Sequence, residues 1–92
     1  MKFEWDEDKN ALNITKHAIS FEQACYVFSD PMYLEMYDFE HSVDEDRYIA
    51  IGMVNDVLFV VFTERKDSIR IISARLATNT ERRIYYDQDS DY

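Results

Sequence analysis

Residues 47–76 read RYIAIGMVNDVLFVVFTERKDSIRIISARL. This stretch predicts three successive strands, at 47–54, 57–62 and 68–76. The middle segment is apolar at every position, so we expect a central strand that is buried on both faces. Asn55-Asp56 and the polar run 64–67 have the composition of tight turns, and tight turns join antiparallel neighbours. The stretch therefore predicts the centre of an antiparallel sheet.

Helices are predicted on both sides of these strands. Asp6 can cap a helix over residues 7–17, and Ser20 with Gln23 forms a capping box for a second, short helix that ends before Pro31. Thr78 with Glu81 forms another capping box, which starts a helix over about 79–88. Residues 2–5 and 32–38 are strand-like. The sequence therefore predicts an α+β fold: an antiparallel β-sheet of about four strands with two N-terminal helices and one C-terminal helix.

Length and composition set the limits of this interpretation. The 92 residues predict one domain, residues 1–86, followed by an acidic tail at 87–92 that we expect to be disordered. We expect a cytoplasmic protein, since no apolar run is long enough for a membrane span and the N-terminus lacks a signal-peptide pattern. Cys25 is the single cysteine, and no Cys/His spacing suits zinc, so we expect no cofactor and no metal.

Charge is divided unevenly along the chain. Residues 1–46 hold three lysines, no arginine and 12 acidic residues, whereas residues 47–86 hold seven basic and four acidic residues. The net charge of −9 argues against broad, non-specific nucleic-acid binding. Arginines gathered on one surface would form a site for an anionic ligand, because guanidinium groups bind phosphate in a two-pronged way. Arginines scattered over the sheet rim would be solubilising charge.

One candidate site joins the last strand to the terminal helix. Its members are Arg70, Ser73, Arg75, Glu81, Arg82 and Tyr85. If they converge on one edge of the sheet, the arginines could stabilise a pentacovalent phosphate, and Glu81 could accept the proton of a 2′-hydroxyl. Tyr85, His17 or a lysine could protonate the leaving oxygen. In the structural alternative Arg70 reaches solvent at the sheet edge, Glu81 is a capping residue and Tyr85 belongs to the core.

Two other polar groups invite a functional interpretation. Lys9, Asn13, Lys16 and His17 form a stripe along the first helix, which is either a phosphate-binding surface or an ordinary solvated face. The loop His41-Ser42 to Arg47 contains a serine, a histidine and acids. Gly52 is the only glycine, so no nucleophile elbow exists and we reject a serine hydrolase. We predict a loop latch, in which Ser42 or His41 meets Glu45 or Arg47. Gly52 itself predicts a bulge or a close approach in its strand.

The chain resembles the BrnT family of toxins from bacterial type II toxin–antitoxin systems. The similarity rests on Trp5-Asp6, Lys9, Asn13, Lys16-His17, Ile19, Phe21, Ala24, Val27-Phe28, Asp30, Asp38, His41-Ser42, Glu45, Arg47, Ile51-Gly52, Ile69 to Arg75, Ala77, Glu81-Arg82 and Tyr85. This resemblance implies a RelE-like ribonuclease fold and metal-independent RNA cleavage that arrests translation. It also implies a ribbon-helix-helix antitoxin, and any contact with DNA is expected to be made through that antitoxin. We expect no membrane partner, and either a homodimer or a toxin–antitoxin heterotetramer.

The resemblance also suggests roles for individual residues. We expect catalytic roles for Arg70, Arg75, Glu81, Arg82, Tyr85 and His17, and RNA binding by Lys9, Asn13, Lys16 and Arg65. The sequence departs from the family pattern at Ala18, where glycine is usual, and a left-handed turn there would be strained by the methyl group. Two rival functions stay open: an inactive module that only binds the antitoxin, and a housekeeping RNA- or anion-binding domain.

Overall fold

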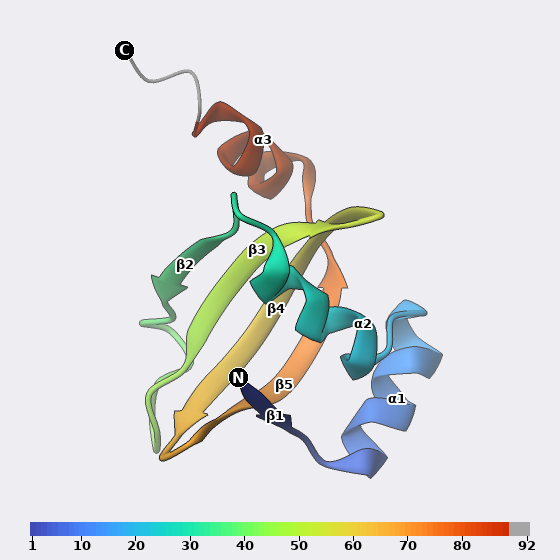
Figure 1. Ribbon diagram of the computed structural model, residues 1–92, viewed down its shortest axis with the longest axis vertical. Helices are drawn as coiled ribbons and strands as arrows, with labels where there is room; N and C mark the ends of the chain where they lie inside the picture. Colours follow the sequence, from blue (N-terminus) through green and yellow to red (C-terminus); the bar gives the residue numbers. More distant parts are fainter. Residues whose placement is uncertain (89–92) are drawn as a thin grey trace.

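The computed structural model describes residues 1–88, which form a five-stranded sheet with helices on one face and at one end (Figure 1). The strand order is β1-β5-β4-β3-β2. The strands are β1 (Lys2–Glu4), β2 (Leu34–Tyr37), β3 (Tyr48–Val54), β4 (Asp56–Arg65) and β5 (Ser68–Leu76). β1 runs parallel to β5, and every other pair is antiparallel. As predicted, the apolar strand β4 occupies the centre.

The helices begin where the sequence places their caps. They are α1 (Glu7–His17), α2 (Phe21–Cys25), the 3-10 turn η1 (Tyr26–Ser29) and α3 (Asn79–Asp87). Asp6 accepts the backbone N–H groups of Asp8 and Lys9, and both predicted capping boxes are formed. α2 and η1 lie across one face of the sheet, α1 lies beside β5, and α3 stands at one end (Figure 1). Within residues 1–88, no helix has the length and apolar character needed to cross a membrane.

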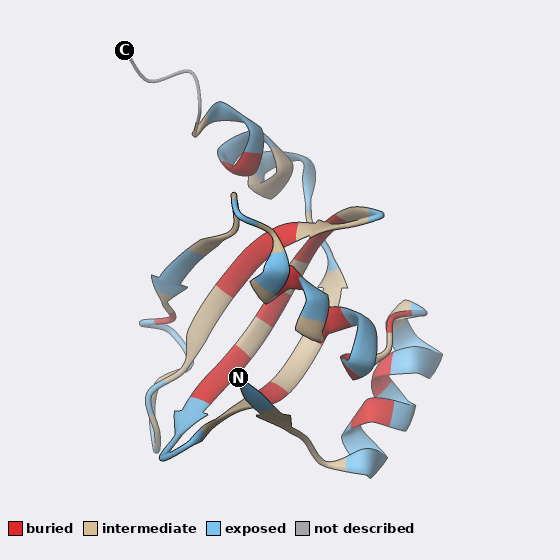
Figure 2. Cartoon of the chain, viewed as in Figure 1, coloured by how far each residue is buried: buried red, intermediate tan, exposed pale blue. Residues whose placement is uncertain are grey.

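The main core lies between the sheet and the α2–η1 segment. Its fully buried side chains include Phe21, Val27, Val60, Phe62 and Ile71, and the buried positions follow alternate residues of β4 (Figure 2). Gly52 of β3 is required here, because an added Cβ would lie 2.8 Å from Val27 Cγ1. This confirms the predicted close approach. Burial of these apolar side chains supplies most of the driving force for folding.

The opposite face of the sheet is only partly covered. Tyr85 of α3 packs on Ile51 and Val57 at one end of this face. Farther along it, Ile49, Phe59 and Val61 stay half-buried. Because Phe59 pairs with Arg75 and Val61 pairs with Ser73, these side chains all share the open face.

A bulge in β5 decides which side chains reach that face. Strict alternation predicts that Ile69, Ile71, Ser73 and Arg75 share one face, with Arg70 on the other. In the structure Ile71 pairs with Phe62 and Ser73 pairs with Val61, so Ile72 is an extra residue. After Ile72, the side chains of β5 therefore point to the opposite faces from those that strict alternation would give. Ile71 and Ala74 both enter the main core.

The α+β class is confirmed, but the predicted sheet and helix layout are corrected. The sheet has five strands instead of about four, and β1 makes it mixed. The second helix has five residues and tightens into η1 before Pro31, which prevents a longer helix. The predicted tail begins inside α3 at Asp87, and Gln88 donates to the Met32 carbonyl at 2.7 Å. The predicted disorder of 89–92 lies outside the described residues.

Candidate functional site

A hollow of about 400 Å³ lies on the open face of the sheet. β3, β4 and β5 form its floor, the loop 38–47 forms one wall, and the first turn of α3 forms another. Its lining residues are Asp38, Glu40, His41, Ile49, Phe59, Val61, Ser73, Arg75 and Glu81. An apolar floor with a few convergent polar groups is the usual composition of a binding site.

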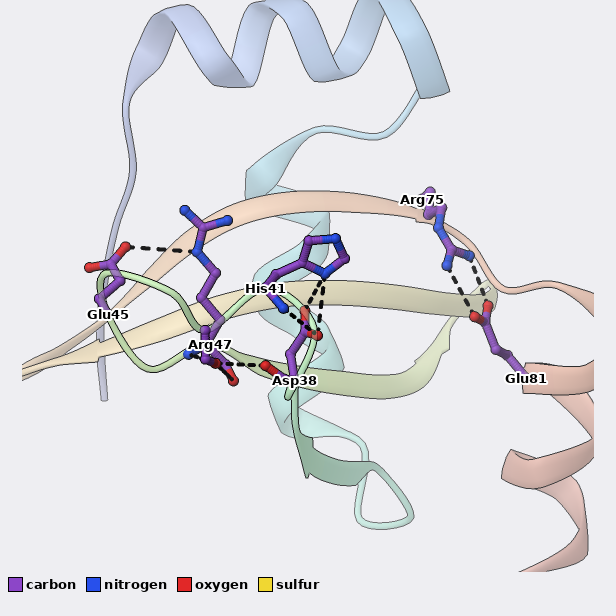
Figure 3. Close-up of polar contacts among 7 residues, drawn as sticks. Asp38, His41, Glu45, Arg47, Arg75 and Glu81 are labelled. Carbon is purple, nitrogen blue, oxygen red and sulfur yellow. Dashed lines mark hydrogen bonds and ion pairs between the residues drawn. The ribbon is translucent and has the colours of Figure 1, made fainter.

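Arg75 and Glu81 form a two-pronged ion pair at one side of the hollow (Figure 3). The two N···O distances are 2.8 and 3.0 Å, and the guanidinium carbon lies 3.9 Å from the centre of the Phe59 ring. Glu81 also accepts the Thr78 N–H at 2.8 Å. Burial works to raise the pKa of Glu81, but the hydrogen bonds from Arg75 and Thr78 outweigh it and lower that pKa. Glu81 is therefore held as a carboxylate.

His41 and Asp38 form a second polar pair, on the wall opposite Arg75. His41 Nδ1 lies 3.0 Å from Asp38 Oδ2, and the His41 backbone N–H donates to Oδ1 at 3.2 Å. Asp38 is 7% exposed, whereas the His41 side chain is 60% exposed. Figure 3 shows the imidazole between Arg47 and Arg75. The pair therefore combines a buried carboxylate with an imidazole that solvent and substrate can reach.

The loop that carries His41 is closed by the predicted latch. Ser42 Oγ donates to the Asp38 carbonyl at 2.6 Å and accepts the Arg47 N–H at 2.8 Å. The Asp38 N–H donates to the Arg47 carbonyl at 2.9 Å. These bonds bring both ends of the loop together and fix the position of His41. The bond from the Arg47 N–H to Ser42 confirms the predicted contact of Ser42 with Arg47. Arg47 Nε also lies 3.9 Å from Glu45.

The basic stripe of α1 borders a second, smaller hollow. This hollow of about 180 Å³ shares Ser73 with the first, and Lys9, Leu12, Asn13, Lys16, His17 and Ile72 line the rest. Asn13 is the exception within the stripe, since it is only 7% exposed. Its amide donates to the carbonyls of Ile19 and Ala74, and its oxygen accepts the Ala74 N–H. Asn13 thus ties α1 to the edge of β5, and its amide is already occupied.

The other predicted residues lie away from the hollow. Arg70 pairs with Glu4 at 2.9 Å near the start of β5, and Arg65 pairs with Glu45 at 3.6 Å. Arg82 pairs with Asp56 where β4 begins, and Tyr85 is buried and donates to Asp30. The prediction that Arg70, Arg75 and Arg82 converge on one spot is therefore wrong. The roles of all these residues in RNA binding or catalysis stay predictions.

The pair of Asp38 and His41 is not among the candidate sites that the sequence predicts. The available signal was the spacing of three residues between an acid and a histidine, which allows a contact within one loop. Nothing in the local sequence indicated that this loop would face Ser73 and Arg75. Among residues 1–88, no three side chains of His, Cys, Asp or Glu are grouped so that they could hold a metal ion.

Two comparisons with known proteins complete the description of the site. No curated protein matches the chain. A family model described as the ribonuclease toxin BrnT of type II toxin–antitoxin systems matches residues 5–81, which include both walls of the hollow. Because the match spans most of the chain, the protein belongs to the BrnT family of ribonuclease toxins.

Proposed function

We propose that the chain is an endoribonuclease that cleaves RNA without a metal ion, at the hollow on the open sheet face. The observation that carries this proposal is the position of Arg75, a guanidinium on an apolar floor beside Ser73. Lys9 and Lys16 line the adjoining hollow across Ser73. A cation fixed at the reacting phosphate, with further cations along the strand, suits a phosphodiester backbone.

The chemistry is attack by the neighbouring 2′-hydroxyl. The bond from O2′ to phosphorus forms as the bond from phosphorus to O5′ breaks, giving a 2′,3′-cyclic phosphate and a 5′-hydroxyl end. The 2′-hydroxyl loses a proton to a base, and the leaving O5′ gains a proton from an acid. Arg75 would stabilise the extra negative charge of the pentacovalent phosphate. His17, which lines the adjoining hollow, is our candidate for the acid.

The biological role follows from family membership. We propose that RNA cleavage by this toxin arrests translation in the cytoplasm. A ribbon-helix-helix antitoxin would neutralise it and would contact DNA, and two copies of each chain would form a heterotetramer. The chain's net charge of −9 would attract a basic segment of that antitoxin.

A second candidate is a catalytically inactive module that binds the antitoxin. It is favoured by one observation: the guanidinium groups of Arg65, Arg70, Arg75 and Arg82 each pair with a carboxylate. An arginine that is already neutralised contributes less charge to phosphate binding. Bound RNA must compete with Glu81 for Arg75.

A cleavage assay separates the two candidates. The toxin would be purified with its antitoxin, freed by denaturation, refolded and incubated with a fluorescent RNA, with and without EDTA. We expect cleavage in both conditions and cyclic phosphate ends. Arg75→Ala should lower kcat/KM by about 100-fold or more, the loss typical of a charge-stabilising group. Arg83→Ala, which removes an exposed arginine of α3, is the matched control and should leave the rate near wild type.

The two candidates give different results in this assay. A folded wild-type chain that leaves every RNA intact, while it still binds the antitoxin, would support the inactive module. A wild-type rate of cleavage in Arg75→Ala would show that the reaction takes place at another site. Circular dichroism of each variant would show that the loss of activity is not a loss of folding.

A further inference from the structure

We propose that His41, oriented by Asp38, is the general base that takes the 2′-hydroxyl proton. This assignment rests on the proposed ribonuclease function and names a catalytic residue that the family resemblance did not suggest for this chain. The sequence had offered Glu81 for that role. The two candidates lie on opposite walls of the same hollow.

The contacts of His41 leave one ring nitrogen available. Nδ1 lies 3.0 Å from Asp38 Oδ2, so in the neutral ring the proton sits on Nδ1 and Nε2 carries the lone pair. Asp38 is nearly inaccessible, and the latch at Ser42 holds its backbone. A buried carboxylate behind an imidazole fixes the ring's orientation and strengthens the opposite nitrogen as a base. Nε2 therefore has the geometry of a proton acceptor in the hollow.

Glu81 lacks that freedom. Both of its oxygens bind Arg75, and one of them also accepts the Thr78 N–H. These three bonds leave about one of the four lone-pair sites of the carboxylate for a substrate proton, and they make the carboxylate a weaker base. Glu81 is better suited to hold Arg75 in place over Phe59.

The two proton transfers of the cleavage step balance when His17 acts as the acid. His41 Nε2 accepts the proton of O2′ as the bond from O2′ to phosphorus forms. The bond from phosphorus to O5′ breaks, and O5′ takes a proton from the imidazolium of His17. The two histidines line hollows that share Ser73, so we place the reacting phosphate beside Ser73, between them. A bell-shaped pH profile is the kinetic signature of such a pair.

Charged groups on both sides of the loop surround His41. In the main hollow these are Asp38, Glu40, Glu81 and Arg75, and on the other side they are Asp44, Glu45 and Arg47. Asp38 is the group in hydrogen-bond contact with the ring, so its replacement should disturb the orientation of His41 and slow the proton transfer.

The test is the pH dependence of kcat/KM for wild type, His41→Gln and Asp38→Asn. His41→Gln should lose 100-fold or more and should lack the acid limb that histidine deprotonation produces. Asp38→Asn should lower kcat at least tenfold and leave KM near wild type, because the imidazole is present but no longer held in orientation. Binding of an RNA with a 2′-deoxy nucleotide at the cleavage site should stay near wild type in His41→Gln. Val43→Ala, an exposed apolar position in the same loop, is the matched control.

Each result has one meaning. If the wild-type chain cleaves RNA and His41→Gln cleaves it equally fast with the same pH profile, His41 is not the base. If His41→Gln is impaired but Asp38→Asn keeps the wild-type kcat, the orienting role of Asp38 is wrong. If the folded wild type cleaves no RNA at all, the proposed function itself fails and this assignment fails with it.

Discussion

Both carboxylate oxygens of Glu81 bind the guanidinium of Arg75, whose central carbon lies 3.9 Å from the centre of the Phe59 ring. The cation that we place at the reacting phosphate is thus pre-positioned by three different elements: β5, β4 and α3. Pre-positioning lowers the cost of organising charge when the transition state forms. It also means that substrate phosphate competes with an internal carboxylate.

Replacing Glu81 by Gln should tighten RNA binding and leave cleavage within about tenfold of wild type. The substitution removes the negative charge beside Arg75, while Gln still provides the acceptor that the capping box needs. Binding of a non-cleavable RNA and single-turnover cleavage would be measured at two salt concentrations. A loss of 100-fold or more in the cleavage step, with unchanged binding, would identify Glu81 as the base and contradict our assignment.

Replacing Asn13 by Ala should lower the free energy of unfolding by about 2–4 kcal/mol. The change removes three hydrogen bonds and leaves backbone groups of Ile19 and Ala74 unsatisfied in the interior. Urea denaturation of the purified toxin would measure the loss. Lys16→Ala, on the exposed side of the same helix, should change stability by less than about 0.5 kcal/mol. Equal stability of wild type and Asn13→Ala would show that the side chain does not tie α1 to β5.

Replacing Ala18 by Gly should stabilise the protein by about 1 kcal/mol. Ala18 ends α1 with φ of 60° and ψ of 28°, a left-handed conformation in which a Cβ is unfavourable. Ala11→Gly provides the opposite control, because it places glycine inside the same helix and should cost about 0.5–1 kcal/mol. Thermal unfolding of both variants would measure the two effects. A destabilised Ala18→Gly would mean that the turn is not strained.

Replacing Asp30 by Asn should remove a stabilisation that depends on pH. Burial works to raise the pKa of Asp30, but hydrogen bonds from Tyr85, Met53 and Met32 outweigh it and lower that pKa. A carboxylate with a lowered pKa stabilises the fold above its unfolded pKa of about 4, and the effect disappears as pH falls through the folded value. The gap in unfolding free energy between wild type and Asp30→Asn should therefore be largest near pH 7 and narrow toward pH 3. If the difference in unfolding free energy stays constant with pH, the ionisation of Asp30 does not contribute to stability.

Features that depend on neighbouring residues could be predicted from the sequence. The three caps at Asp6, Ser20 and Thr78 are local hydrogen-bond patterns, and all of them form. Asn55 at the β3–β4 turn has φ of 62°, as its tolerance for positive φ predicted, whereas Asp56, the predicted second turn residue, is the first residue of β4. These features need no knowledge of the rest of the fold.

Features that depend on distant pairing could not be predicted in this way. β1 pairs with β5, which lies more than 60 residues later, and no local pattern selects that partner. The bulge at Ile72 cannot be distinguished from regular alternation in an apolar strand. It nevertheless decides whether Arg70 lies on the same face of the sheet as Ser73 and Arg75. The pairing of the predicted arginines with Glu4, Glu45 and Asp56 likewise depends on tertiary contacts. The site of His41 is missed for the same reason, because its loop meets Arg75 only in the folded chain.

The most direct test of the central claim is an NMR titration of the isotope-labelled toxin with a short RNA that carries a 2′-deoxy nucleotide at the cleavage site. We expect the largest amide shifts at His41, Ser73 and Arg75, and smaller shifts in α1 at Lys16 and His17. Shifts that gather instead around Trp5 and Tyr26, where another hollow opens beside α2, would place RNA elsewhere and contradict the account.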